Sequence, residues 1–328
     1  MDFSKVIKEV GRGKNHARDL DRQTAFELYR AILAGEVPEL ELGGLLIAFR
    51  IKGEAEGEML GFYQAMEERV MALQAPADMP PPIVIPSYNG ARKQANLTPL
   101  LALALSRLDF PVVVHGVTED PGRVTSAEIF RALDVPWQDS QAGAQSALVM
   151  GRQPVFIPIR LLCPALDGQL KLRWRMGVRN SAHTLAKLAT PFHHHLHWRL
   201  ASVSHPEYIT RVGDFFKAIN SSALLMNGTE GESYANPQRL SKIFGLYQGE
   251  QQLLLDPSLY PLAPLEALPA DRDAAATACW TQACLRGEFA LPQSIRLQLA
   301  CCLAATGRSL SMAQGLDYVD GVFSRPRG

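Results

Sequence analysis

The chain has 328 residues, of which 47% are hydrophobic and 20% charged, so it is long enough for one large domain or two unequal ones. Its 33 lysines and arginines are balanced by 33 acidic residues, which excludes a uniformly basic nucleic-acid-binding chain, whose isoelectric point is typically above about 9. No apolar run approaches the roughly 18 residues that cross a membrane, and residues 1–15 are too polar for a signal peptide, so we expect no membrane partner.

The first part of the chain has the pattern of a small helical domain. Apolar positions recur at helical spacing in residues 24–33. Residues 42–51 are apolar on nearly all sides, which predicts a buried helix, and residues 57–73 predict one more amphipathic helix. The proline-rich stretch 74–82 predicts a hinge. We therefore expect a helical domain over residues 1–74.

From residue 75 onward the pattern changes to an alternation of strands and helices. Short apolar runs, each followed by a turn that contains glycine, occur at residues 83–85, 112–114 and 223–226. Helical patterns such as residues 97–108 and 209–219 separate them. This alternation is typical of a mainly parallel sheet with helices on its faces. We expect an α/β domain over residues 75–328, with its binding loops at the carboxyl ends of the strands.

The turn after the first expected strand is a candidate anion site. A turn from a strand into a helix, with its backbone N–H groups facing outward, is where many α/β proteins hold a phosphate. Here the turn contains a single glycine, Gly90, followed by the cations Arg92 and Lys93. Two interpretations remain: the two cations face a polyanion, or they are exposed residues of an ordinary loop.

A basic segment at residues 170–187 is the second candidate. Between Arg160 and Lys187 the only acidic residue is Asp167, whereas six lysines and arginines occur there. In a helix from Lys171 to Arg179, three cations four residues apart would form one row and could follow a phosphate backbone, which gives affinity without sequence preference. The candidate nucleic-acid-binding cations are Arg92, Lys93, Lys171, Arg173, Arg175, Arg179 and Lys187.

The alternative for this segment is a solvated helix face that binds nothing. An aromatic residue among the cations, Trp174, would stack on a base in a single-strand-binding protein, but a lone tryptophan more often packs in a core. We therefore expect Trp174 to be buried.

The five cysteines have neither the number nor the spacing of a zinc site or a disulfide framework. We expect all of them to be reduced structural thiols in a cytoplasmic protein. They are Cys163, Cys279, Cys284, Cys301 and Cys302.

Several motifs along the chain resemble those of anthranilate phosphoribosyltransferases, which belong with the class II pyrimidine nucleoside phosphorylases. They are AILAGEV at 31–37, IKGE at 51–54, RWRMGVRN at 173–180, VSHPE at 203–207 and CCLAATG at 301–307. The resemblance covers almost the whole chain. It implies a small helical domain, against which residues 168–190 pack, a larger α/β domain with a mainly parallel central sheet, and a homodimer formed through the amino-terminal helices.

The substrate loops depart from this family. Its pyrophosphate-binding GTGGD turn corresponds here to SYNGA at 87–91, and its KHGNR loop to VHGVT at 114–118. Its magnesium-binding Asp-Glu pair falls on Gly231 and Glu232, so one carboxylate is missing. The resemblance thus implies a vestigial substrate cleft, and its residues are Ser87, Asn89, Gly90, Asn96, Thr98, His115, Gly116 and Glu232.

These departures, together with the basic segment, resemble the YbiB-like branch of the family, whose members have the transferase fold and bind nucleic acid. Our first hypothesis is a homodimer that binds single-stranded DNA or RNA with little sequence preference, with no catalytic residue, metal or cofactor. The alternative is a phosphoribosyltransferase that acts on an unknown acceptor, and only this alternative requires magnesium. A third hypothesis is a sensor of small nucleotides that uses the old cleft.

Overall fold

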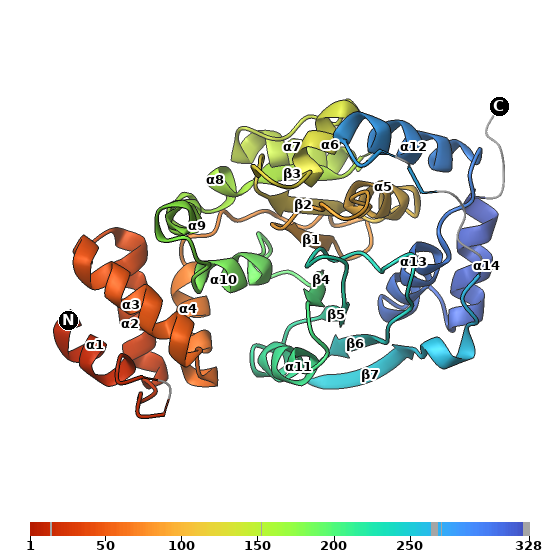
Figure 1. Cartoon of the computed structure of the whole chain (residues 1–328). Coiled ribbons are helices and arrows are strands. Elements are labelled where there is room, and N and C mark those ends of the chain that lie inside the picture. The colour runs from red at the N-terminus through yellow and green to blue at the C-terminus, as the bar shows by residue number, and fades with distance from the viewer. Residues whose placement is uncertain (14, 152, 264–267, 270, 324–328) are drawn as a thin grey trace. The chain divides into compact units, whose positions relative to one another are not determined.

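The computed structural model describes residues 1–328 except 14, 152, 264–267, 270 and 324–328. The chain forms two compact units (Figure 1). Unit 1 contains residues 1–72 and 159–193, and unit 2 contains residues 73–158 and 194–328. The first boundary falls close to residue 74, and the segment that returns to the helical unit is longer than residues 168–190.

Unit 1 is helical. Its helices are α1 (Phe3–Val10), α2 (Arg22–Ala34), α3 (Glu39–Lys52), α4 (Glu56–Glu67), α8 (Ile159–Leu162), α9 (Pro164–Met176) and α10 (Ala182–Leu188). Local signals set the ends of α2, because the Asp21 carboxylate accepts from the Thr24 N–H at 2.9 Å and Gly35 adopts the left-handed conformation after the last turn. The rings of Tyr29 and Phe62 stack at 4.8 Å in the core of this unit.

The prediction that residues 42–51 form a fully buried helix is wrong on one face. In α3, Leu45, Leu46 and Phe49 are buried, but Ile47 and Ile51 are exposed by 37% and 58%. Together with Leu40 and Gly44, which are also exposed, they form one stripe along the helix, because positions 40, 44, 47 and 51 follow the helical repeat. We call these four residues the α3 stripe.

The helix of the basic segment also ends earlier than predicted. Gly177 has a φ of 72° and closes α9 at Met176 by donating its N–H to the Arg173 carbonyl at 2.8 Å. Arg179 therefore lies beyond the helix, and the predicted row of Lys171, Arg175 and Arg179 on one helix does not form.

Unit 2 is built on a seven-stranded sheet in the order β3-β2-β1-β4-β5-β6-β7 (Figure 1). The strands are β1 (Ile83–Ser87), β2 (Val112–Gly116), β3 (Val155–Pro158), β4 (Trp198–Val203), β5 (Ala223–Asn227), β6 (Ile243–Tyr247) and β7 (Glu250–Leu255). The pairs from β3 to β5 are parallel, and β6 and β7 add two antiparallel strands. The predicted fold class, a helical domain plus an α/β domain with a mainly parallel sheet, is confirmed.

The helices of unit 2 are α5 (Thr98–Arg107), α6 (Ser126–Ala132), α7 (Gln141–Met150), α11 (Tyr208–Ala218), α12 (Ala274–Arg286), α13 (Gln293–Ala305) and α14 (Met312–Phe323), with a short 3₁₀ turn at Pro257–Leu259. Apolar residues of the sheet and of α5, α6, α12 and α13 form one core. Because β1, β2 and β5 run in the same direction, the loops after them lie at one edge of the sheet.

All five cysteines are free, and only Cys279 among them is exposed. Within the described part of the chain, no helix combines the length and the apolar character needed to span a membrane.

Candidate functional site

The turn after β1 is held against its neighbours by close backbone contacts. Ser87 is paired with Gly116 at the end of β2, and a Cβ on Gly116 would lie 1.8 Å from the Ser87 carbonyl oxygen, so the pairing requires glycine there. Gly90 has a φ of 61°, and a Cβ there would lie 2.6 Å from the Val124 carbonyl oxygen. Ala91 exchanges two backbone hydrogen bonds with Val124, at 3.0 and 2.9 Å. The turn is therefore fixed in shape.

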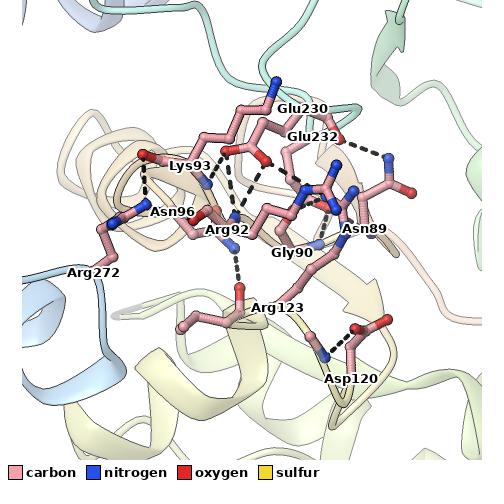
Figure 2. Close-up of polar contacts among 12 residues, drawn as sticks. Asn89, Gly90, Arg92, Lys93, Asn96, Asp120, Arg123, Glu230, Glu232 and Arg272 are labelled. Atoms are coloured by element: carbon pink, nitrogen blue, oxygen red, sulfur yellow. Dashed lines mark hydrogen bonds and ion pairs between the residues drawn. The ribbon is translucent and has the colours of Figure 1, made fainter.

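The backbone N–H groups of this turn point at a carboxylate from the same chain. Glu232 accepts hydrogen bonds through Oε1 from the N–H groups of Asn89 at 2.8 Å and Gly90 at 2.9 Å (Figure 2). Its Oε2 accepts from the hydroxyl groups of Ser87 at 2.5 Å and Thr98 at 3.0 Å. Glu232 is fully buried. Four donors from one strand-to-helix connection thus surround one internal carboxylate.

A second carboxylate occupies the next part of the turn. Glu230 accepts from the N–H groups of Arg92 at 3.2 Å and Lys93 at 2.9 Å, and it forms an ion pair with Arg123 at 3.6 Å (Figure 2). On the other side, the Arg272 guanidinium donates to the carbonyl groups of Arg92 at 2.8 Å and Lys93 at 3.1 Å. The backbone of these two predicted site residues is therefore held from both sides.

A tight turn after β5 presents both carboxylates. Thr229 and Glu232 exchange two backbone hydrogen bonds, at 3.1 and 2.8 Å, and the residues between them, Glu230 and Gly231, have φ values of 52° and 90°. These are the left-handed values of a two-residue hairpin turn. A non-glycine residue with positive φ is uncommon, so Glu230 adopts this conformation against its intrinsic preference.

The remaining residues of the predicted cleft lie around the same carboxylate. Asn96 donates to the Ser126 hydroxyl at 3.2 Å, and this hydroxyl is 2.7 Å from that of Ser87. The Thr98 N–H donates to the Asn96 side chain at 3.1 Å. In the neighbouring loop, the His115 Nδ1 atom is 2.7 Å from the Tyr88 hydroxyl. The eight residues predicted as a vestigial cleft therefore lie together at one edge of the sheet of unit 2.

The carboxylates of this site do not suit a magnesium ion in the observed arrangement. Magnesium takes oxygen ligands in a nearly ideal octahedron, and a backbone N–H cannot be a ligand. Both oxygens of Glu232 face hydrogen-bond donors, and Glu230 faces two N–H groups and the Arg123 guanidinium. In the described ranges there is no group of three or more His, Cys, Asp or Glu side chains that could hold a metal ion.

The hydroxyl group of Tyr234 lies close to the same carboxylates. Its pKa is raised far above the usual value, mainly by burial and further by the nearby Glu232 and Glu230 carboxylates. It donates to the Ala95 carbonyl at 3.2 Å, so this tyrosine acts as a neutral structural donor behind the turn.

The side chains of Arg92 and Lys93 are exposed. In Figure 2 the Lys93 amine extends away from the turn. Among the described residues neither side chain forms an ion pair with an acidic group. The two predicted cations thus border a turn whose backbone donors are already engaged.

The second candidate site lies in unit 1. We call Lys171, Arg173, Arg175, Arg179 and Lys187 the cationic cluster. Burial lowers the pKa of His183 to about 4, and the charges of Arg179, Arg173 and Lys187 contribute to this shift. Although Arg179 is outside α9, its charge therefore acts on His183 together with those of Arg173 and of Lys187 in α10.

The prediction that Trp174 is buried is wrong. Its side chain is 57% exposed, and the Arg173 guanidinium lies over its ring at 4.5 Å from the centroid. The buried residues of α9, Leu166, Gln169 and Leu170, all belong to its first half, whereas Trp174 lies in its last turn. An exposed aromatic ring thus lies beside cations.

Lys171 and Arg175 of the cluster form ion pairs with acidic residues. Lys171 pairs with Asp167 at 2.7 Å, and Arg175 pairs with Glu39 at 3.4 Å. The second pair was missed because Glu39 is far away in sequence. Both partners of the Arg175–Glu39 pair are exposed, and such pairs contribute roughly 0–1 kcal/mol, so an incoming phosphate can replace the Glu39 carboxylate at small cost.

Sequence reasoning also missed four residues of the turn after β1 and its surroundings, namely Arg123, Ser126, Glu230 and Arg272. Only Glu230 left a local signal, because it lies with Glu232 in the glycine-containing turn GTEGE after an apolar run. The other three come from distant segments that the fold brings together.

Comparison with known proteins identifies relatives of this chain. The model of the glycosyl transferase family, helical bundle domain, matches residues 4–70. The uncharacterized protein YbiB of Escherichia coli K12 is 56% identical over 323 residues, which are 98% of this chain and 100% of that protein. The anthranilate phosphoribosyltransferase of Saccharolobus solfataricus is 29% identical over 196 residues, which are 58% of this chain and 53% of that enzyme.

Solved structures show the same fold. Anthranilate phosphoribosyltransferase from Thermus thermophilus superposes with a TM-score of 0.78 at 24% identity, covering 99% of this chain and 95% of that chain. The Saccharomyces cerevisiae enzyme in complex with PRPP and Mg superposes with a TM-score of 0.76 at 13% identity, covering 98% and 93%. By its identity along nearly the full length of both chains, this protein belongs to the YbiB family, which has the fold of anthranilate phosphoribosyltransferases.

Proposed function

We propose that this protein binds single-stranded DNA or RNA with little sequence preference, through the cationic cluster of unit 1. The observation that carries the proposal is the exposed Trp174 ring in the last turn of α9, with the Arg173 guanidinium lying over it. Proteins that bind single strands without sequence preference combine cations that contact phosphates with aromatic rings on which bases stack. The cluster offers both groups on one surface.

Charge distribution supports this proposal despite the zero net charge. The charges of Arg179, Arg173 and Lys187 add to burial in lowering the pKa of His183, which supports a locally positive environment around that side chain. A phosphate backbone is attracted by the local potential, whereas salt weakens the attraction strongly because binding releases counterions. We propose Arg92 and Lys93 of unit 2 as further phosphate contacts, because their side chains are exposed.

We further propose that the protein is a homodimer formed through the α3 stripe. One side of α3 is packed in unit 1, and the exposed apolar stripe on another side suits contact with a second copy of the chain. The first turn of α3 contains Glu41 and the last turn contains Arg50, so two antiparallel α3 helices would place opposite charges beside each other. A dimer carries two cationic clusters, and a strand that reaches both is bound more tightly through effective concentration.

The test of nucleic-acid binding is fluorescence anisotropy of a labelled single-stranded oligonucleotide at two salt concentrations. We expect submicromolar binding at low salt and a steep loss on adding salt. The double variant Arg173→Glu/Arg175→Glu should bind more weakly and with a flatter salt dependence. A matched control, Lys5→Glu/Lys217→Glu, changes the net charge equally at exposed positions outside the cluster and should bind like the wild type. Equal binding by both double variants would show that the cluster is not the binding surface.

Phosphoribosyl transfer to an unknown acceptor is the second candidate function. It is favoured by the fold and by the 29% identity to an anthranilate phosphoribosyltransferase. If it holds, pyrophosphate release from phosphoribosyl pyrophosphate requires magnesium and fails in Glu232→Gln. The absence of release with every aromatic acceptor tried would remove this candidate.

A further inference from the structure

The turn after β1 has the properties of an anion site, and these properties do not depend on the proposed nucleic-acid function. Its donors are the successive N–H groups of Asn89 and Gly90 and the hydroxyl groups of Ser87 and Thr98. Successive backbone N–H groups at a strand-to-helix turn form a concave donor surface that suits an anion. Here all four donors converge on the two oxygens of Glu232.

Because Glu232 is completely buried, protein donors take the place of the water that would hydrate its carboxylate in solution. The side chain is completely buried, and no lysine or arginine among the described residues forms an ion pair with it. A buried carboxylate needs its charge to be met by hydrogen bonds or by a counter-charge. Here two N–H groups and two hydroxyl groups donate hydrogen bonds to the carboxylate. The turn therefore holds this carboxylate as it would hold a bound anion.

The turn of residues 229–232 is shaped for this insertion. A Cβ on Gly228 would lie 2.1 Å from the Glu232 carbonyl oxygen, so the chain can enter the turn this closely only with glycine at that position. Glu230, in its left-handed conformation, directs a second carboxylate to the N–H groups of Arg92 and Lys93 (Figure 2). An external phosphate would meet two negative charges and no open donor on the backbone of residues 89, 90, 92 and 93.

We infer that Glu232 is a built-in anion: its carboxylate occupies a cradle that would otherwise bind an inorganic phosphate group, and the cradle becomes a phosphate site when that carboxylate is removed. In the wild-type protein the cradle is therefore closed to free phosphate and pyrophosphate. Glu232 in this role stabilises the fold and is not a ligand of a metal.

The experiment is a thermal unfolding series of the full-length wild type, Glu232→Ala and Glu232→Gln with inorganic phosphate or chloride at equal ionic strength. Glu232→Ala leaves the four donors and a vacancy, so it should unfold at lower temperature and be stabilised saturably by phosphate. At about 100 times its dissociation constant, phosphate should raise the Tm by roughly 4 °C. Glu232→Gln is the matched control, because it removes the same charge but fills the vacancy, and phosphate should leave its Tm unchanged.

The wild type provides a second measurement, which remains decisive if Glu232→Ala fails to fold. Titration calorimetry of the wild type with pyrophosphate, with and without magnesium, should show no saturable binding. Saturable binding that Glu232→Gln abolishes would overturn the inference and make Glu232 part of an open substrate site. A folded Glu232→Ala protein that phosphate does not stabilise would also overturn it. Neither result would alter oligonucleotide binding by the cationic cluster, so the two proposals fail separately.

Discussion

Glu232 accepts a hydrogen bond from the backbone N–H of Gly90 at 2.9 Å, although the two residues are 142 positions apart in sequence. Gly90 provides the positive φ of 61° and the close approach to Val124 that orient this N–H group. Glu232 reaches it from a turn after β5. This contact joins the two loops that the resemblance to phosphoribosyltransferases assigns to pyrophosphate and to magnesium. Donors of the pyrophosphate loop stabilise the carboxylate of the magnesium loop.

Replacement of Trp174 by alanine should weaken binding of single-stranded oligonucleotides roughly 5- to 150-fold, because stacking contributes about 1–3 kcal/mol per base. Trp174→Phe should retain most of the affinity. Anisotropy titrations at one fixed salt concentration check this expectation. The control is Phe289→Ala, which removes an exposed aromatic ring from unit 2. Unchanged affinity in Trp174→Ala would mean that the ring makes no contact with the strand.

His183 should make unit 1 less stable in mildly acidic solution. Burial, together with the charges of Arg179, Arg173 and Lys187, lowers the pKa of His183 to about 4, whereas the unfolded chain has a histidine pKa near 6.5. Between these two values the unfolded state binds more protons, so stability is complete above pH 6.5 and is lost as the pH falls toward 4.

Urea unfolding of the wild type at pH 7 and at pH 5 measures this loss, which should be roughly 2 kcal/mol for the histidine alone. His183→Gln cannot take up the proton, so its loss over the same interval should be smaller by that amount. Identical pH dependence of the two proteins would show that His183 does not titrate in this window.

Gly116→Ala should destabilise unit 2 by at least roughly 2 kcal/mol, because its Cβ would lie 1.8 Å from the Ser87 carbonyl oxygen in a paired strand that cannot move aside. Gly321→Ala is the matched control. Gly321 lies in α14, and a Cβ added to it would have no heavy atom within 4 Å, so alanine should stabilise the helix by roughly 0.5–1 kcal/mol. Urea denaturation followed by circular dichroism measures both, and a similar effect of the two substitutions would contradict the steric argument.

Ile47→Glu should dissociate the proposed homodimer, because it places a charge in the middle of the α3 stripe. Sedimentation velocity of the wild type should show a dimer, and that of the variant a monomer of 36.0 kDa with unchanged circular dichroism. Leu310→Glu serves as the control, since Leu310 is 94% exposed and lies outside the stripe. A wild type that sediments as a monomer would remove the proposal.

The strands identified from sequence are buried along nearly their whole length, although β3, which is equally buried, was not identified. Residues 83–85, 112–114 and 223–226 lie in β1, β2 and β5, which are buried on both faces and therefore read as continuous apolar runs. The antiparallel strand β7 was missed because the sequence EQQLLL is polar at its start and largely exposed. The end of α9 was missed although Gly177 marks it, because a glycine after a basic run does not by itself reveal a positive φ.

The sequence by itself determined the fold class and the family resemblance, because these depend on local periodicity and on short motifs. The resemblance to the family's substrate loops also located the eight residues of the vestigial cleft. Only the tertiary structure decided what those residues do to one another: Glu232 meets the N–H groups after β1, Arg272 meets the carbonyl groups of the same turn, and Trp174 faces outward. Hydrogen bonds between distant segments and the exposure of a side chain depend on how the elements pack, and no local pattern in the chain encodes them.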